Sequence, residues 1–206
     1  REDVKALLFE GISYTIVNPS VIQLRRKRII DKNKVLSVAI TMGGSDTHGS
    51  TLIILRAVLA FLKDKCKFNV YTGPHFLHQR ELSSLLPTLD FDVSITHFPS
   101  DLHQELNSND VIICGGGVTL FEACSMGFPV LSFANEFHEE KNIDYFSSLN
   151  FCRFLGSIKD VDIKGIGGRL NAFLSDIELL NEMSNSAFNT VKDGTNNCVE
   201  SICNIL

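Results

Sequence analysis

Residues 110–129 read DVIICGGGVTLFEACSMGFP and combine an apolar run, three glycines and a helix-forming segment. The run 111–114 predicts a strand, and Gly127 with Pro129 predicts the end of a helix over 118–126. The first amides of a helix lack internal partners and carry partial positive charge, and glycine lets a ligand approach the backbone closely. This stretch therefore predicts a turn that binds an anion, such as the diphosphate of a nucleotide.

The segments around this stretch alternate between strand and helix patterns. Apolar, β-rich runs predict strands at 35–42, 68–71, 92–96, 111–114, 130–133 and 152–155. Helical spacing follows at 51–62, 75–86, 101–106, 118–126, 139–149, 158–174, 177–191 and 197–205. Such alternation predicts an α/β fold, a Rossmann-like three-layer sandwich with a mostly parallel sheet of about six strands over residues 34–206. Residues 1–33 are expected to form a helical tail (1–10), a crossover strand (12–17) and a linker.

Composition narrows the classes of function. The chain has 206 residues, a net charge of −5 and 44% hydrophobic residues, which predicts a substantial core and argues against general nucleic-acid binding. The basic run at 25–28, with Lys32 and Lys34, is expected to be a solvated linker or an edge that faces another domain. No apolar run reaches about 18 residues, so no membrane span is predicted.

The six cysteines show neither a CxxC motif nor ligand-like spacing with histidine. Cysteine beside apolar residues behaves as a small buried hydrophobe, which favours a reducing, cytoplasmic location. We expect no metal and no cofactor. The chain begins at Arg1 without a methionine, and we expect it to be part of a longer protein.

Three turns follow predicted strands and should meet at the edge where such sheets bind ligands: 43–46, 72–75 and 115–119. In the first, Gly43, Gly44 and Ser45 are candidate phosphate contacts. Asp46 would repel a phosphate and is expected to cap the next helix instead. His48 is a candidate acid or base, although a single histidine at a helix start is more often structural.

The second candidate group lies in the opening stretch itself. Gly115, Gly116 and Gly117 exceed what a tight turn needs, which favours ligand approach over turn geometry alone. Thr119 and Glu122 fit two explanations: a T-x-x-E capping box, or a carboxylate that accepts hydrogen bonds from the two hydroxyls of a ribose. The glycines do not follow the GxGxxG pattern of dinucleotide-binding domains.

The segment after the fifth predicted strand, NEFHEEKN at 135–142, supplies the last candidates. Glu139 and Asn142 are predicted to reach sugar hydroxyls, while His75 and His138 are weak candidates. The sequence shows no Ser-His-Asp order and no paired carboxylates that would make a self-contained active site.

These motifs together resemble the carboxy-terminal domain of the glycosyltransferase-B superfamily. The resemblance spans residues 11–206 and rests on the frame G-G-x-T-x-x-E-x-x-x-x-G-x-P, here Gly116 to Pro129. It is strongest to the SpsG spore-coat polysaccharide family and to the UDP-sugar hydrolase of pseudaminic acid biosynthesis. The transferase that makes lipid II is a more distant relative.

The resemblance implies a nucleotide-sugar site. It implies that Glu122 holds the ribose, that the loop 115–119 lies against the diphosphate, that Gly44-Ser45 approaches from the other side, and that Asn142 faces the sugar. Val118 departs from the hydrolase relatives, which tend to carry a serine there. The resemblance also places the catalytic histidine and the acceptor site in an amino-terminal domain that these residues do not include. The catalytic residues are therefore unknown, and this part alone should bind a nucleotide-sugar without turnover.

Three functions follow as alternatives. The first is the nucleotide-sugar-binding half of a UDP-sugar hydrolase or glycosyltransferase in surface-polysaccharide or nonulosonic-acid synthesis. The second is a non-catalytic nucleotide-sugar-binding module fused to another enzyme. The third is an ordinary NAD-binding domain, which predicts that NADH binds at least as tightly as UDP.

Overall fold

A computed structural model describes residues 7–61 and 66–205. Six strands form one sheet in the order β3-β2-β1-β4-β5-β6, and every neighbouring pair is parallel. The prediction of a Rossmann-like parallel sheet is therefore confirmed. The strands are β1 (Leu36–Thr41), β2 (Cys66–Thr72), β3 (Val93–His97), β4 (Val111–Cys114), β5 (Val130–Ala134) and β6 (Cys152–Ser157).

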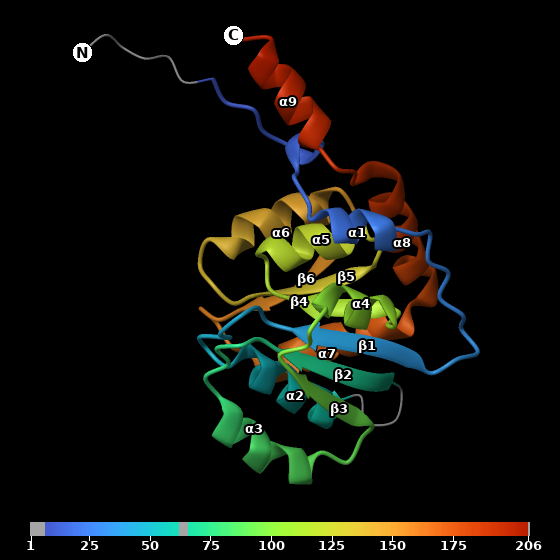
Figure 1. Ribbon diagram of the computed structural model, residues 1–206. Helices are drawn as coiled ribbons and strands as arrows, with labels where there is room; N and C mark the ends of the chain where they lie inside the picture. The colour runs from blue at the N-terminus through green and yellow to red at the C-terminus, as the bar shows by residue number, and fades with distance from the viewer. Residues whose placement is uncertain (1–6, 62–65, 206) are drawn as a thin grey trace.

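Helices cover both faces of the sheet (Figure 1). One face carries α1 (Pro19–Leu24), α4 (Leu102–Asn107), α5 (Val118–Ser125) and α6 (Glu139–Ser148). The other carries α2 (Ser50–Phe61), α3 (Gln79–Leu85) and α7 (Ile163–Ser175), while α8 (Ile177–Thr190) supplies residues to the cores on both sides. Short 3₁₀ helices occupy Ile12–Tyr14 and Leu86–Thr88, and α9 (Thr195–Cys203) stands away from the sheet beside the amino-terminal segment.

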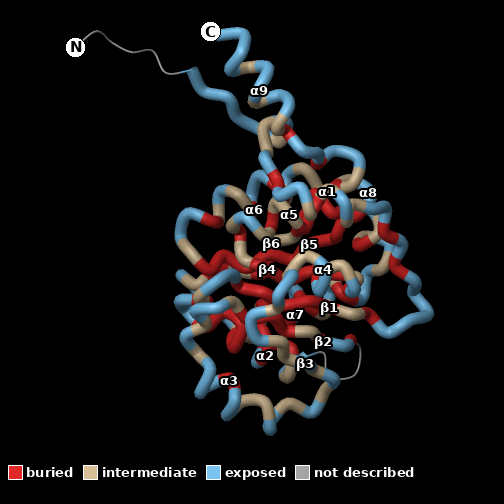
Figure 2. Tube along the Cα trace, in the orientation of Figure 1, coloured by how far each residue is buried: buried red, intermediate tan, exposed pale blue. Residues whose placement is uncertain are grey.

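The central strands β1, β4 and β5 supply the centre of both cores, and Figure 2 shows them almost entirely buried. Along β4, Val111 and Ile113 pack with α2 and α7, whereas Ile112 and Cys114 pack with α5 and α6. This alternation follows from the period of two in a strand, and full burial of a side chain of this size stabilises the fold by about 1.5–3 kcal/mol. A strand buried on both faces reads as a continuous apolar run, which is why β4 could be recognised in the sequence.

Four of the six cysteines are buried within these cores, as expected for small hydrophobes: Cys66, Cys114, Cys124 and Cys152. Burial raises the pKa of the Cys114, Cys124 and Cys152 thiols, so they stay protonated at neutral pH. No helix in the described ranges has both the length and the apolar character that a bilayer crossing requires.

The predicted helical tail and crossover strand within residues 1–33 are wrong where the structure describes them, whereas residues 25–33 form no helix or strand, as expected for a linker. Residues 12–17 form no strand, because no sheet edge lies beside them; the Thr15 carbonyl accepts instead from Gly194 at the start of α9. Residues 7–10 are not helical, and residues 1–6 lie outside the described part. The helix α1 was also missed, although its six residues follow an N-cap asparagine, Asn18, and begin with Pro19, which are signals of a helix start.

The basic run is only in part the solvated linker that was expected: Arg26, Lys27, Lys32 and Lys34 are exposed, whereas Arg25 and Arg28 pack against the ends of helices. Arg25 donates to the carbonyls of Ser125, Phe188 and Val191, which terminate α5 and α8. Arg28 is buried over the ring of Phe128, with 3.2 Å from its guanidinium carbon to the ring centroid, and burial lowers its pKa to about 9. Cations are favoured at helix carboxyl ends, where carbonyls lack partners.

Two helices begin later than predicted. At α3, the amides of His75 and Leu77 donate to the Gly44 and Ser45 carbonyls, so residues 75–78 join the β1 loop instead of the helix. At α7, a turn from Ser157 to Asp160 delays the start to Ile163. At α3, contacts distant in sequence override local helical spacing, whereas at α7 a local turn does so.

Candidate functional site

A cavity of about 230 Å³ lies at the carboxyl ends of the central strands. It sits where the chain order reverses between β1 and β4, the usual ligand position in open α/β sheets. All three predicted loops contribute to its lining, so the prediction that they converge is confirmed. The lining residues from these loops are Gly43, Gly44, Gly73, Pro74 and Thr119.

The β1 loop leaves open space at its glycines. A Cβ placed on Gly43 or Gly44 would meet no atom within 4 Å, and Gly43 has a positive φ of 79°. On the other side, a Cβ on Gly73 would lie 2.4 Å from the Gly44 backbone, so the loops after β1 and β2 pack directly together. The open side of Gly43 and Gly44 is therefore available to a ligand, while their backbone is held in place from behind.

The amino terminus of α2 is already capped. The carboxylate of Asp46 accepts from the Ser50 amide at 2.7 Å and from the Thr51 amide at 2.9 Å, and Asp46 is buried. The Ser45 hydroxyl is 3.1 Å from that of Thr47. Asp46 thus has the structural role expected from the sequence, and its negative charge occupies the position that an anion would take.

The amino terminus of α5 has no such cap. Gly117 occupies the N-cap position, no side chain bonds to the first turn, and Val118 is 71% exposed. Because the helix begins at Val118, Thr119 and Glu122 do not form a capping box, and that alternative is wrong. Thr119, in the first turn of α5, lines the cavity, so this helix begins beside it.

The glycine loop before α5 packs against α6. A Cβ on Gly115 or Gly117 would lie 3.3 or 3.2 Å from the Glu139 carboxylate, and one on Gly116 would lie 2.8 Å from Ile143. Glu139 is buried, and its carboxylate accepts from the amides of residues 135 and 136. Room for α6 is thus a third reason for these glycines, beyond the two that the sequence suggested.

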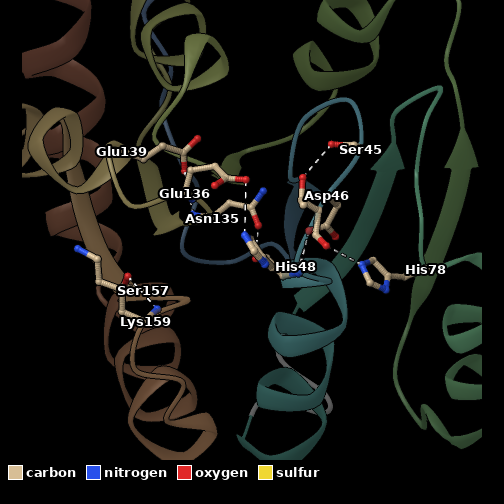
Figure 3. Close-up of polar contacts among 11 residues, drawn as sticks. Ser45, Asp46, His48, His78, Asn135, Glu136, Glu139, Ser157 and Lys159 are labelled. Atoms are coloured by element: carbon tan, nitrogen blue, oxygen red, sulfur yellow. Dashed lines mark hydrogen bonds and ion pairs between the residues drawn. The ribbon is translucent and has the colours of Figure 1, made fainter.

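Asn142 lies one turn further along α6 and holds the same loop. Its side-chain amide donates to the Gly116 carbonyl at 2.9 Å. The loop before α6 also meets the start of α2: the Ser50 hydroxyl donates to Asn135 at 2.6 Å, and His48 lies 3.6 Å from Glu136 (Figure 3). The structure therefore brings the predicted residues of the loops after β1, β4 and β5 to one edge of the sheet.

Glu122 faces α4 and pairs with a histidine that the sequence analysis did not single out. Its carboxylate oxygen is 3.0 Å from Nε2 of His103, and the two side chains are 15% and 17% exposed. The hydrogen bond to Glu122 raises the pKa of His103, against the opposing effect of burial. No sequence motif joins the two residues, since only the packing of α4 beside α5 makes them neighbours.

The other candidate histidines stand apart from this group. His75 and His138 are exposed, and neither lines the cavity at the sheet edge. His48 lies at the rim, 41% exposed, beside Glu136.

Comparison with known proteins supports the architecture. No family model matches the chain. Over 154 residues it is 30% identical to an uncharacterised protein, MJ1062, of Methanocaldococcus jannaschii; the match covers 72% of this chain but only 32% of that protein. The chain thus spans about a third of the length of this curated relative.

Solved glycosyltransferases share the fold. MurG of Acinetobacter baumannii matches with a TM-score of 0.64 and 15% identity over 84% of this chain and 51% of that one. WaaG, a glycosyltransferase of lipopolysaccharide biosynthesis, matches with a TM-score of 0.59 and 15% identity over 88% of this chain and 49% of that one. The rhamnosyltransferase SpnG, solved with thymidine diphosphate, matches with a TM-score of 0.54 and 16% identity over 88% of this chain and 45% of that one. The chain has the Rossmann-like fold that forms about half of each of these glycosyltransferase-B enzymes.

Proposed function

We propose that this chain is the nucleotide-sugar-binding half of a glycosyltransferase or UDP-sugar hydrolase, and that it holds the nucleotide diphosphate leaving group. The observation that carries the proposal is the uncapped amino terminus of α5 beside the cavity at the β1–β4 switch point. Solved enzymes of the same fold, SpnG and VinC among them, have been determined with nucleoside diphosphates.

The diphosphate would lie between α5 and the β1 loop. The first-turn amides at Val118 and Thr119 offer partial positive charge, and no side chain caps them; the Glu139 carboxylate beside the glycine loop is bonded to the amides of its own loop. Gly43 and Gly44 supply open space opposite them, while Ser45 adds a hydroxyl at the rim. Stabilising charge on a departing diphosphate is the kind of electrostatic contribution that such amides make to group transfer.

The ribose is assigned to Glu122. Thr119, one turn earlier on α5, and Leu102, beside His103 on α4, both line the cavity, whereas Glu122 and His103 do not; the ribose would therefore lie at the edge of the cavity, next to this pair. One carboxylate oxygen is engaged by His103, and the other would accept from a ribose hydroxyl. That oxygen has two lone pairs, enough for both the 2′ and the 3′ hydroxyl, so we expect the chain to prefer ribose over deoxyribose.

The sugar itself would lie toward α6. Asn142 fixes the glycine loop through Gly116 and faces the same side, whereas the Glu139 carboxylate is already bonded to its own loop. We therefore favour Asn142 over Glu139 as a sugar contact. The general base and the acceptor site would come from a further domain, so these 206 residues should bind nucleotide without turnover. The same proposal includes a cytoplasmic location and a role in surface-polysaccharide or nonulosonic-acid synthesis.

Calorimetric titration of the 206-residue chain tests this assignment. The nucleotides are UDP, UDP-N-acetylglucosamine, CMP, NADH and dUDP, which differs from UDP only at the 2′ position. We expect UDP to bind more tightly than NADH and more tightly than dUDP. Tightest binding of NADH would instead support the dinucleotide-binding alternative.

The Glu122→Ala variant ties that preference to one residue. We expect its UDP affinity to fall about tenfold, equivalent to about 1.4 kcal/mol, and its preference for UDP over dUDP to disappear. Glu182→Ala, which removes an exposed carboxylate of α8, is the matched control and should bind like the parent. A folded chain that binds none of these nucleotides contradicts the proposal.

A further inference from the structure

Hydrogen bonds join side chains of α1, α4 and α5 in a row that ends at Glu122. Nε2 of His103 is 3.0 Å from the Glu122 carboxylate, and Nδ1 of the same ring is 3.3 Å from the Ser20 hydroxyl. In the part of the chain that the structure describes, the Glu122 carboxylate has no other hydrogen bond or ion pair. A single histidine therefore fixes this carboxylate.

Counting protons along the row gives the charge of the ring. The Asn18 side-chain oxygen caps α1 and accepts from both the amide and the hydroxyl of Ser20, each at 3.0 Å. A hydroxyl has one proton; when that proton is directed at Asn18, the Ser20 oxygen accepts from Nδ1 of His103. The carboxylate accepts from Nε2. In this arrangement both ring nitrogens carry a proton, which agrees with the raised pKa of His103.

This polarity distinguishes the row from a hydrolytic triad. In a Ser-His-acid triad the ring takes the proton of the serine hydroxyl, which requires an unprotonated nitrogen facing the serine. In the arrangement described here the nitrogen facing Ser20 is the donor, and the Ser20 hydroxyl donates its proton to the Asn18 oxygen. Ser20 thus serves as a support for the ring and not as a nucleophile.

We propose that His103 is a positioning residue for Glu122: its imidazolium, supported by Ser20, fixes one carboxylate oxygen and turns the other toward the bound nucleotide. The proposal rests on the ribose assignment made above. It also connects the segment before β1 to the site, because Ser20 and its cap Asn18 belong to α1.

The surroundings of His103 favour the charged ring. Glu122 on α5 and Asp101 at the start of α4 are the charged groups that raise its pKa, burial lowers it, and α1 presents the neutral Ser20. When the ring loses a proton, Nδ1 and the Ser20 oxygen face each other without a proton between them, unless Ser20 releases Asn18. Either result loosens the support of Glu122 as the pH rises through the pKa of His103.

Histidine-ring nitrogen NMR on the 206-residue chain tests the charge directly. We expect His103 to have both ring nitrogens protonated at pH 6.5 and to titrate at a higher pH than a histidine in an unfolded peptide, about 6.5. Glu122→Gln and Ser20→Ala should each shift its titration to lower pH. A His103 ring that is neutral at pH 6.5, or that titrates like the unfolded peptide, overturns the proposal.

UDP affinity as a function of pH tests the positioning. His103→Gln keeps a neutral donor toward Glu122 but cannot carry charge; we expect it to bind UDP about fivefold more weakly than the parent at pH 6.5, with the difference vanishing near pH 9. Gln104→Ala, on the exposed side of α4, is the control and should follow the parent at every pH.

The two measurements separate the two proposals. A raised His103 titration with a UDP affinity that is the same in parent and His103→Gln at every pH overturns the positioning role but leaves the nucleotide site standing. If UDP does not bind at all, the proposed function fails, and the positioning role fails with it whatever the charge of the ring.

Discussion

The helices α2 and α5 occupy equivalent places, yet they use their amino termini in opposite ways. Each follows a central strand, β1 or β4, and begins at the same edge of the sheet (Figure 1). In α2 the terminal amides are bonded to the buried carboxylate of Asp46, whereas in α5 no side chain caps the first turn. One terminus is satisfied within the protein, and the other is available for a ligand.

The carboxylates near these two termini, Asp46 before α2 and Glu122 within α5, also have different partners. Asp46 faces backbone amides of its own helix and contributes to stability. Glu122 lies one turn into α5, where it meets a titratable side chain of a different helix. A glycine loop followed by a helix is therefore insufficient to locate an anion site, since the side chains near the first turn decide whether the amides remain available.

Removing the Asp46 carboxylate that caps α2 should have the largest effect of these changes, a loss of stability. We expect Asp46→Ala to lower the free energy of unfolding by about 3 kcal/mol, because two amides at buried residues lose their acceptor and alanine is strained at the positive φ of 46°. Urea denaturation measures the loss.

Two companion variants separate the causes. Asp46→Asn tolerates the same backbone conformation and keeps one acceptor oxygen, so it should lose less than alanine does. Thr47→Ala, at the exposed neighbouring position, should change little. Equal stability of the parent and Asp46→Ala would show that α2 does not depend on this cap.

A carboxylate added at the start of α5 should make it resemble α2. We expect Val118→Asp to weaken UDP binding about tenfold, or about 1.4 kcal/mol, through repulsion of the diphosphate. Since Val118 is exposed and an acid suits a helix amino terminus, the free energy of unfolding should stay within about 0.5 kcal/mol of the parent. Val118→Asn has nearly the same shape without charge, and identical UDP affinities of the two variants would contradict a diphosphate at this position.

The smallest expected effect is on the stability of the fold and concerns the pair formed by Glu122 of α5 and His103 of α4. Because the hydrogen bond to Glu122 raises the folded-state pKa of His103, the pair should stabilise the fold fully below the unfolded value of about 6.5 and lose this contribution as the pH rises through the folded value. We expect the stability difference between the parent and His103→Gln to shrink, by less than about 1 kcal/mol, from pH 6 to pH 9. Urea midpoints at the two pH values measure it, and a difference that grows with pH would contradict the assignment.

The sequence was informative wherever a local pattern determines the structure. Strands buried on both faces, such as β4, appear as unbroken apolar runs, and Gly127, with a φ of 82°, ends α5 as expected. These signals were enough to predict the parallel sheet and to bring three loops to one edge. The cap formed by Asp46 was also predictable, since its two partners lie four and five residues away.

The features that the sequence did not reveal depend on contacts between distant residues. Arg25 of the basic run is a capping residue only because α5 and α8 end beside it. The row from Ser20 to Glu122 requires α1, α4 and α5 to pack together, and residues 12–17 alternate like a strand but have no sheet edge to join. Spacing along the chain contains no information on such neighbours.

The most direct test of the central claim compares the two helix termini in one experiment. Backbone amide NMR of the 206-residue chain, recorded with increasing UDP, follows Val118 and Thr119 on α5 together with Ser50 and Thr51 on α2. We predict large shifts at Val118 and Thr119 and little change at Ser50 and Thr51, whose amides are bonded to Asp46. Shifts confined to the start of α2, or absent from both termini while UDP binds elsewhere, would contradict the assignment of the diphosphate to α5.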